Sequence, residues 1–171
     1  MWDNGCARNC PENILAARSA PKRALRLAGF VPFRLNRLAA AVSQHLAVIY
    51  RARFALDIPA WRVIATVGER HGCTAQHVAD STRMHKTRVS RAIAQLRARG
   101  LIARAASARD GREMQLRLTR AGRRLYAQLV PLVLARERGL LRCMSAAERR
   151  GFLRGLERLE TFLLLRDRHV G

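Results

Sequence analysis

The most regular pattern of apolar and polar positions lies in the segment MHKTRVSRAIAQLRARGL, residues 84–101. Val89, Ile93 and Leu96 follow one another at steps of four and three, so they share one face of a helix that can pack on a core. The opposite face combines small residues with one central cation: Thr87, Arg91, Ala94 and Ala98. The pattern predicts an amphipathic helix whose basic outer face can closely approach a partner.

Steps of three and four between apolar residues also predict a helix over residues 33–56. After it, Asp57 is an N-cap and Pro59 suits the first turn of a second helix, which Gly72 ends. Thr74 caps a short third helix, and the basic helix follows as the fourth. Four helices in succession are therefore expected.

The period changes after the basic helix. Residues 101–107 and 113–119 alternate apolar and polar side chains, which is typical of half-buried strands. Asp110 and Gly111 between them form a strong hairpin turn signal. Two short helices, a basic helix and a hairpin with arginines at its tip together predict a winged helix-turn-helix.

Two longer helices complete the predicted fold, which is mainly α with a small β-hairpin wing. Thr119 caps a helix over residues 120–142, and Ser145 to Glu148 form a capping box that opens the last helix. The last helix carries an apolar stripe: Phe152, Leu156, Leu159 and Leu163. The stripes on the first and last helices cannot all be buried within one small lobe, which indicates a further interface.

Residues 1–30 differ from the rest of the chain. Pro11 and Pro21 interrupt any long helix there, leaving room for short helices over 12–19 and 22–28. We interpret residues 1–30 as a loosely ordered N-terminal extension.

The charge is large and unevenly placed. The chain of 171 residues has a formal net charge of +21. Residues 83–124 contain thirteen Lys and Arg residues but only two acidic residues, so about half of the surplus lies in a quarter of the chain. Such a surplus predicts a polyanionic partner, because Lys and Arg displace the counterions condensed on phosphates. An anionic membrane surface is the other candidate.

The sequence has no apolar run long enough for a membrane-spanning helix and no apolar signal-peptide core, so we expect a cytoplasmic protein without a membrane partner. In that compartment its four cysteines are expected to be free thiols: Cys6, Cys10, Cys73 and Cys143. Cys6 and Cys10 could hold a metal or form a redox pair, but no second cysteine or histidine motif accompanies them. We therefore expect no metal and no cofactor.

In a winged helix-turn-helix the basic helix is the recognition helix. Thr87, Ser90 and Arg91 then face the major groove, where Arg can pair with guanine through two hydrogen bonds. Lys86 and Arg88 lie towards the flanks of this face. The alternative for a basic helix taken alone is a solvated charged surface.

The hairpin tip supplies the rest of the predicted DNA-binding site. Arg109 and Arg112 are placed to enter the neighbouring minor groove or to contact phosphates, and Asp110 orients the tip.

From about Phe33 to Leu165, roughly three-quarters of its length, the chain resembles the MarR family of transcriptional regulators. The resemblance is carried by PAWRVIATV, TAQHVADSTRMHKTRVSRAIAQLRARGLIAR, DGRE and LRLTRAG. It implies an obligate homodimer in which residues 31–56 and 120–171 form a helical dimerisation region, and residues 57–119 form the DNA-binding lobe. It also implies double-stranded DNA with a palindromic operator as the partner, and in many members repression that a small aromatic acid or phenol releases.

The resemblance places an effector pocket between the first two helices and the DNA-binding lobe. Residues there that could hold an aromatic carboxylate are His45, Arg53, Trp61 and Arg62. The alternative is that Trp61 belongs to the core and that the arginines are solvated or paired. Peroxide-sensing members carry a cysteine at the start of the first helix, and this chain has none between Phe33 and Tyr50, so we expect no thiol switch. The five histidines are scattered, which argues against metal sensing.

The sequence favours one of three functions. A ligand-responsive, sequence-specific repressor is the prediction. A charge-driven architectural protein of the nucleoid type is the alternative, and it would bind random DNA nearly as well as any operator. We expect no enzyme, because the sequence has no Gly-rich phosphate loop, no paired carboxylates of a cleft and no nucleophile with its base.

Overall fold

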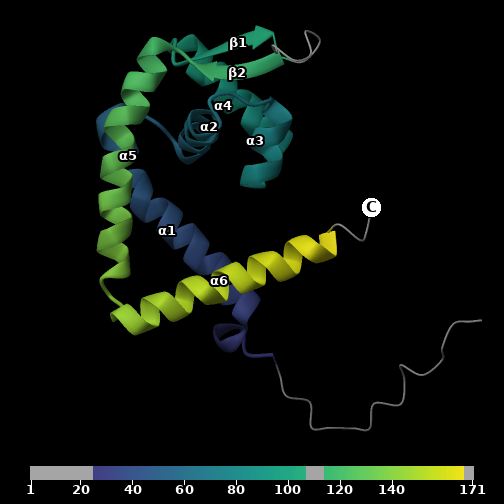
Figure 1. Cartoon of the computed structure of the whole chain (residues 1–171), viewed down its shortest axis with the longest axis vertical. Coiled ribbons are helices and arrows are strands. Elements are labelled where there is room, and N and C mark those ends of the chain that lie inside the picture. Colours follow the sequence, from purple (N-terminus) through teal and green to yellow (C-terminus); the bar gives the residue numbers. More distant parts are fainter. Residues whose placement is uncertain (1–24, 107–113, 168–171) are drawn as a thin grey trace, which may run out of the picture. The chain divides into compact units, whose positions relative to one another are not determined.

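The computed structural model describes residues 25–106 and 114–167 (Figure 1). The chain divides into two compact units, Met1–Ala39 and Ala40–Gly171. The elements follow in the order η1 (Leu27–Gly29), α1 (Val31–Phe54), α2 (Ile58–Glu69), α3 (Ala75–Thr82), α4 (Lys86–Ala98), β1 (Ile102–Ala106), β2 (Met114–Leu118), α5 (Arg120–Leu141) and α6 (Ala146–Asp167). The predicted class, mainly α with a small β wing, is confirmed.

The core of the second unit lies in the lobe that the sequence places over 57–119. There α2 packs against α3, α4, β2 and the first part of α5, and α4 packs against α3 and β1. Val89, Ile93 and Leu96 are all buried, as the helical spacing predicts. Tyr50 and Leu56, from the end of α1 and the loop after it, are buried in the same core.

Polar side chains begin the helices where the sequence predicts them. Asp57 accepts a hydrogen bond from the Ala60 N–H at 2.8 Å, and Thr74 accepts one from the His77 N–H at 3.0 Å. Both acceptors satisfy N–H groups that have no partner inside their helix. The predicted capping box also forms, since Glu148 accepts from the Ser145 N–H at 2.8 Å and donates its own N–H to the Ser145 hydroxyl at 3.3 Å. Hydrogen bonds from Ser145 lower the pKa of the Glu148 carboxyl.

Two predicted helix ends differ from the structure. The first helix ends at Phe54 instead of residue 56, because Ala55 adopts a positive φ of 48°. The sequence places the end of α2 at Gly72, but the helix ends at Glu69. His71 and Gly72 then both adopt positive φ, 56° and 137°, which turns the chain back towards β2. Cys73 pairs there with Leu116 through two backbone hydrogen bonds of 3.2 and 2.8 Å. Because Cys73 must reach β2, the helix stops early.

The wing is the antiparallel pair of β1 and β2, with Ile102 opposite Leu118 and Ala106 opposite Met114. Within the wing, the side chain of Leu116 in β2 is buried. The predicted Asp110-Gly111 turn lies outside the described residues.

Thr119 and Gly122 join the end of the recognition helix to the start of α5. The Thr119 N–H donates to the Leu101 carbonyl at 3.1 Å, and the Thr119 hydroxyl donates to the Gly100 carbonyl at 2.6 Å. The same hydroxyl oxygen accepts the Gly122 N–H at 3.1 Å and so caps α5. A Cβ atom on Gly122 would overlap the Leu101 carbonyl oxygen, so the close approach requires glycine.

We expect Gly122→Ala to lower the free energy of unfolding by about 1–3 kcal/mol, because the added methyl group overpacks the contact with the Leu101 carbonyl. Urea denaturation followed by circular dichroism measures the change. Gly139→Ala is the matched control in the same helix, since a Cβ there meets no atom within 4 Å. The control should leave stability unchanged or raise it by up to about 1 kcal/mol. Equal stability of the two variants would contradict the close approach.

Candidate nucleic-acid interface

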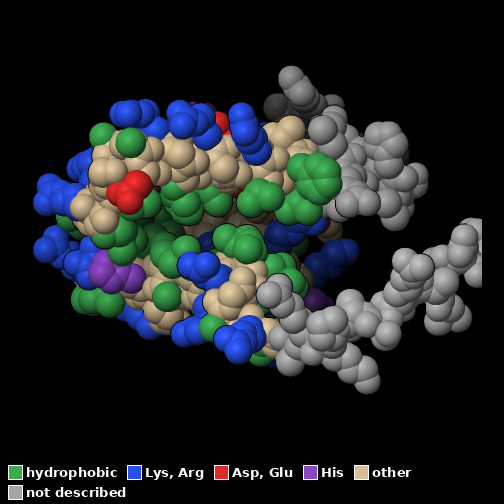
Figure 2. Space-filling model, turned by 90° about the horizontal axis from the view of Figure 1, so that it is seen from below, with side chains coloured by type: hydrophobic (Ala, Val, Ile, Leu, Met, Phe, Trp, Pro, Cys, Tyr) green, Lys and Arg blue, Asp and Glu red, His purple; other side chains and the backbone are tan. Residues whose placement is uncertain are grey.

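The exposed face of α4 carries the side chains that the sequence assigns to the major groove. The five predicted residues of this helix are all exposed: Lys86, Thr87, Arg88, Ser90 and Arg91. Val89 and Ile93, on the opposite face, are buried and anchor the helix in the core. The helix begins with His85, whose Nδ1 accepts the Thr87 N–H at 3.3 Å, a cap that the sequence analysis did not predict. Figure 2 shows the molecule from below, a different side, and there too Lys and Arg side chains are more common than Asp and Glu.

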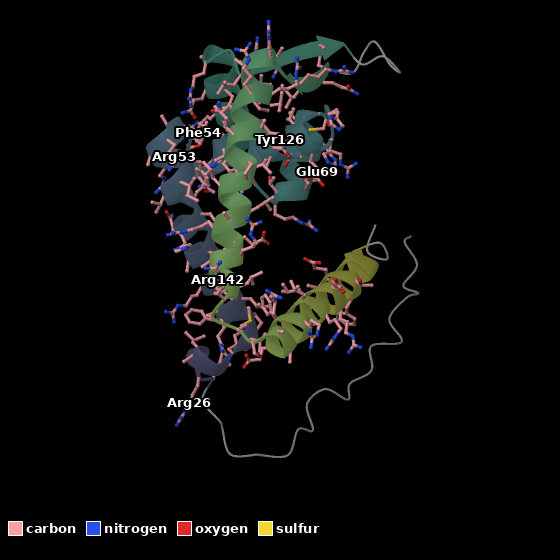
Figure 3. All side chains as sticks on the ribbon, turned by 60° about the vertical axis from the view of Figure 1, so that its left-hand side comes forward. Arg26, Arg53, Phe54, Glu69, Tyr126 and Arg142 are labelled. Atoms are coloured by element: carbon pink, nitrogen blue, oxygen red, sulfur yellow. The ribbon has the colours of Figure 1, made fainter. Side chains whose placement is uncertain are left out.

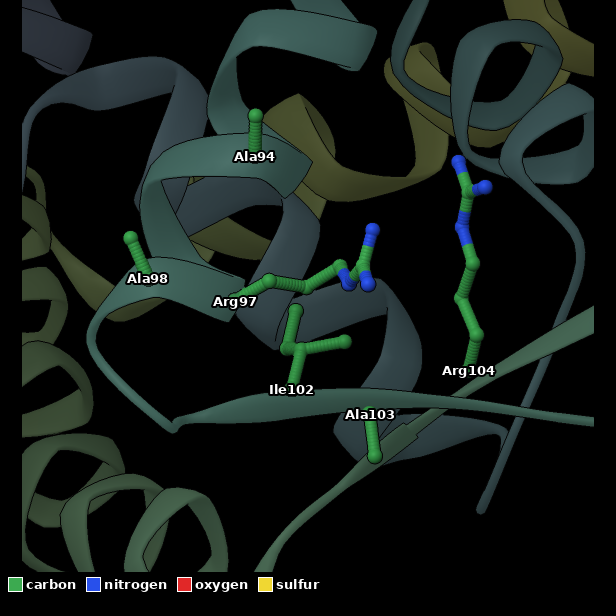
Figure 4. A pocket seen from close by; sticks show the side chains of 6 residues that line it. All are labelled: Ala94, Arg97, Ala98, Ile102, Ala103 and Arg104. Carbon is green, nitrogen blue, oxygen red and sulfur yellow. The ribbon is translucent and has the colours of Figure 1, made fainter.

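A groove between α4 and β1 extends this face (Figure 4). Its volume is about 610 Å³, and the residues that line it are Ala94, Arg97, Ala98, Ile102, Ala103 and Arg104. The small side chains keep the groove open, while Arg97 from the helix and Arg104 from the strand bring two guanidinium groups to it. Two cations beside a hollow of small residues suit a phosphate group.

Arg97 and Arg104 belong to the clustered charges of residues 83–124, but neither was predicted to be part of the site. The signal for Arg104 was present, because it lies two residues after the buried Ile102 and therefore on the strand face that packs on α4. The signal for Arg97 was weaker. It lies on the flank of the recognition helix, and only the position of β1 turns that flank into a groove.

The predicted contacts of the wing tip cannot be placed. Arg109, Asp110 and Arg112 lie outside the described residues, so their assignment to the minor groove stays a prediction.

The predicted effector residues are only partly brought together. Trp61 stacks on Tyr50 with ring centroids 5.7 Å apart, and Arg62 donates to the Ser43 hydroxyl at 3.4 Å. Tyr50 in turn donates to the Ser43 carbonyl at 3.4 Å. Burial raises the pKa of the Tyr50 hydroxyl, against the opposing effect of Arg51 and Arg62.

Within residues 25–106 and 114–167, no hydrogen bond or ring contact joins His45 or Arg53 to the group around Trp61. Arg53 is exposed near the end of α1 (Figure 3), and His45 is half-buried. Tyr50 and Ser43 were not predicted, since the residues that contact Trp61 and Arg62 depend on how α1 meets α2.

The two cysteines of the described residues differ in exposure. Cys73 is buried, and burial raises the pKa of its thiol, which disfavours the reactive thiolate. Cys143 is exposed. In the described part of the chain, no three His, Cys, Asp or Glu side chains gather closely enough to hold a metal ion. Nor does any helix there have the length and apolar character needed to cross a membrane.

The fold and its basic face define a winged helix-turn-helix protein of the DNA-binding class. The model of the MarR family matches residues 56–113. A MarR-family transcriptional regulator from Silicibacter pomeroyi DSS-3 is 30% identical, with a TM-score of 0.67, and the match covers 80% of this chain and 98% of that one. The chain therefore belongs to the MarR family of transcriptional regulators.

Other solved structures share the fold at lower identity. A MarR/EmrR-family regulator from Acinetobacter sp. ADP1 is 23% identical with a TM-score of 0.73, over 81% of this chain and 98% of that one. BpsR from Bordetella bronchiseptica, whose DNA binding is regulated by 6-hydroxynicotinic acid, is 20% identical with a TM-score of 0.69. That match covers 80% of this chain and 97% of BpsR. No protein with a curated description matches the chain.

We expect Arg97→Gln and Arg104→Gln each to weaken DNA binding to all sequences alike. Each should also reduce the slope of log affinity against log salt by about one per subunit, because one phosphate contact is lost. Fluorescence anisotropy of labelled duplexes at several salt concentrations measures both effects. Arg136→Gln, an equal charge change at an exposed position of α5, is the control and should leave the slope unchanged. The same slope for all four proteins would mean that no phosphate enters the groove.

Proposed function

We propose that this protein is a sequence-specific repressor that binds a palindromic operator as a homodimer and is released by a small aromatic acid. The observation that carries the specific DNA contact is the exposed face of α4, where Arg91 lies among small and hydroxylated side chains. Such a face can enter the major groove, and an arginine at its centre can recognise guanine. At the wing, Arg109 and Arg112 would contact the minor groove, with Asp110 orienting the tip.

The charge-driven alternative rests on the net charge of +21, which alone supports binding to any DNA. Charge does not explain the arrangement on α4, however. An architectural protein gains nothing from Thr87, Ser90 and Ala94 around a single central arginine, because these side chains add no charge. The arrangement favours a protein that reads base edges.

We expect Arg91→Ala to weaken binding to the operator by about 1–3 kcal/mol while leaving affinity for random DNA much less affected. Arg97→Gln is the matched comparison, since it should weaken binding to the operator and binding to random DNA by similar factors. The operator is first found by footprinting the DNA upstream of the protein's own gene. Titrations of operator and scrambled duplex with each variant then measure the specificity ratio. An unchanged ratio for Arg91→Ala would favour the architectural alternative.

The homodimer is proposed from the apolar side chains that the second unit leaves exposed. Among residues 146–163 of α6 none is buried, and Leu153, Leu159 and Leu163 are each more than two-fifths exposed. In proteins most of the stability of such a helix comes from packing of its apolar face. A second copy of the chain offers the same apolar face, and a twofold pairing buries both. The family supports the same arrangement.

We expect Leu159→Asp to raise the dissociation constant of the dimer by at least about tenfold, because the pairing would bury an unpaired carboxylate. Sedimentation velocity over a range of concentrations measures it. Arg154→Asp introduces the same side chain at an exposed position on another face of α6 and should change the constant far less. A parent protein that sediments as a monomer at all concentrations would refute the proposal.

The effector is proposed by analogy with BpsR, whose DNA binding is regulated by 6-hydroxynicotinic acid, an aromatic acid. The residues that we propose for it are those expected from the sequence: His45, Arg53, Trp61 and Arg62. An aromatic ring beside a guanidinium, as at Trp61 and Arg62, could hold an aromatic carboxylate by stacking and charge.

A further inference from the structure

A second cavity of the lobe lies apart from both the recognition helix and the group around Trp61. It has a volume of about 480 Å³ and is lined by the end of α2, the turn after it, β2 and the first turns of α5. None of the residues that line it belongs to α4. Neither the DNA contacts nor the expected effector residues use it.

Two glycines shape this cavity. The ring of Tyr126 on α5 (Figure 3) lies against Gly68, where a Cβ atom would come within 2.8 Å of a ring carbon. The stem of Arg117 lies across Gly72, where a Cβ would meet its Cγ at 3.3 Å. The pairing of Cys73 with Leu116 holds the turn beside β2. The cavity walls are therefore fixed by backbone contacts and close packing.

The polar groups at the cavity are positive or neutral. Arg117, Arg123 and His71 contribute two guanidinium groups and an imidazole, and none of the described residues that line the cavity is acidic. Arg123 is positioned by a hydrogen bond from its Nη1 to the Leu118 carbonyl at 2.9 Å. A guanidinium offers five N–H donors, so one such bond leaves others for a ligand. These groups favour an anion.

The other lining residues are apolar or aromatic: Val67, Leu118 and the ring of Tyr126. A bare phosphate would leave this apolar surface in contact with water, whereas an aromatic ring would cover it. We propose that the cavity is a second site, which binds a small aromatic carboxylate with its carboxylate at Arg117 and Arg123 and its ring against Tyr126.

A ligand at this place would bridge β2 and α5 on either side of Thr119. Thr119 bonds to the carbonyls of Gly100 and Leu101 at the end of the recognition helix. Occupancy of the cavity therefore changes operator affinity, a consequence that rests on the proposed function as a DNA-binding repressor. Binding of the carboxylate itself does not rest on it.

The test uses the full chain without DNA and isothermal titration calorimetry. The probes are benzoate and 4-hydroxybenzoate, with benzyl alcohol as the neutral aromatic and inorganic phosphate as the anion without a ring. Both carboxylates should bind at least about tenfold more tightly than the other two probes. Arg117→Gln and Arg123→Gln should each weaken carboxylate binding by about tenfold, the loss of one charged hydrogen bond.

Two matched variants remove an exposed guanidinium elsewhere in the chain. Arg136→Gln and Arg154→Gln should leave this binding unchanged, and thermal unfolding of every variant shows that it is folded. Arg62→Gln removes the guanidinium of the site proposed at Trp61, so it should leave the loss caused by Arg117→Gln and Arg123→Gln in place. The proposal is overturned if neither carboxylate binds, if phosphate binds as well as they do, or if only Arg62→Gln weakens binding. Operator titrations with and without 4-hydroxybenzoate form the second arm. Binding of the carboxylate without any change in operator affinity would leave the site standing and contradict its role in repression.

Discussion

The lobe depends on one junction, where the Leu101 carbonyl receives the Thr119 N–H and lies against Gly122. This junction closes the hairpin at its base, ends the recognition helix and starts α5 with a cap. A larger residue than glycine would push α5 away from the carbonyl, and loss of the Thr119 hydroxyl would leave the Gly100 carbonyl without its 2.6 Å hydrogen bond. The orientation of the recognition helix relative to α5 therefore depends on Thr119 and Gly122, which contact no DNA in our proposal.

Much of this fold could be predicted from the sequence, because the decisive signals are local. Asp57, Thr74 and Thr119 each accept an N–H from the residue three positions later, which requires only a short side chain at the right place. The exposed and buried faces of α4 follow from helical spacing alone. Family membership was visible for the same reason, since its motifs consist of these caps, the recognition helix and the Thr119 to Gly122 segment.

The parts that could not be predicted depend on contacts between distant segments. α2 ends early because Cys73 pairs with Leu116, more than forty residues away in the sequence. Tyr50 joins Trp61, and Arg97 joins Arg104, only once helices and strands have packed. The cavity beside Tyr126 likewise needs three elements. A sequence pattern reports which face of an element is apolar, but it does not report which element will cover that face.

The recognition helix is also tied to α1. Arg99 donates to the carbonyls of Phe54 and Ala55 at 2.7 and 2.9 Å, so a positive guanidinium satisfies acceptors at the negative end of α1. The next residue, Gly100, accepts the Thr119 hydroxyl. Consecutive residues at the end of α4 thus connect it to α1 on one side and to α5 on the other. Both α1 and α5 belong to the region proposed to form the dimer. The spacing of the two recognition helices on DNA would therefore depend on how the helices of that region pack.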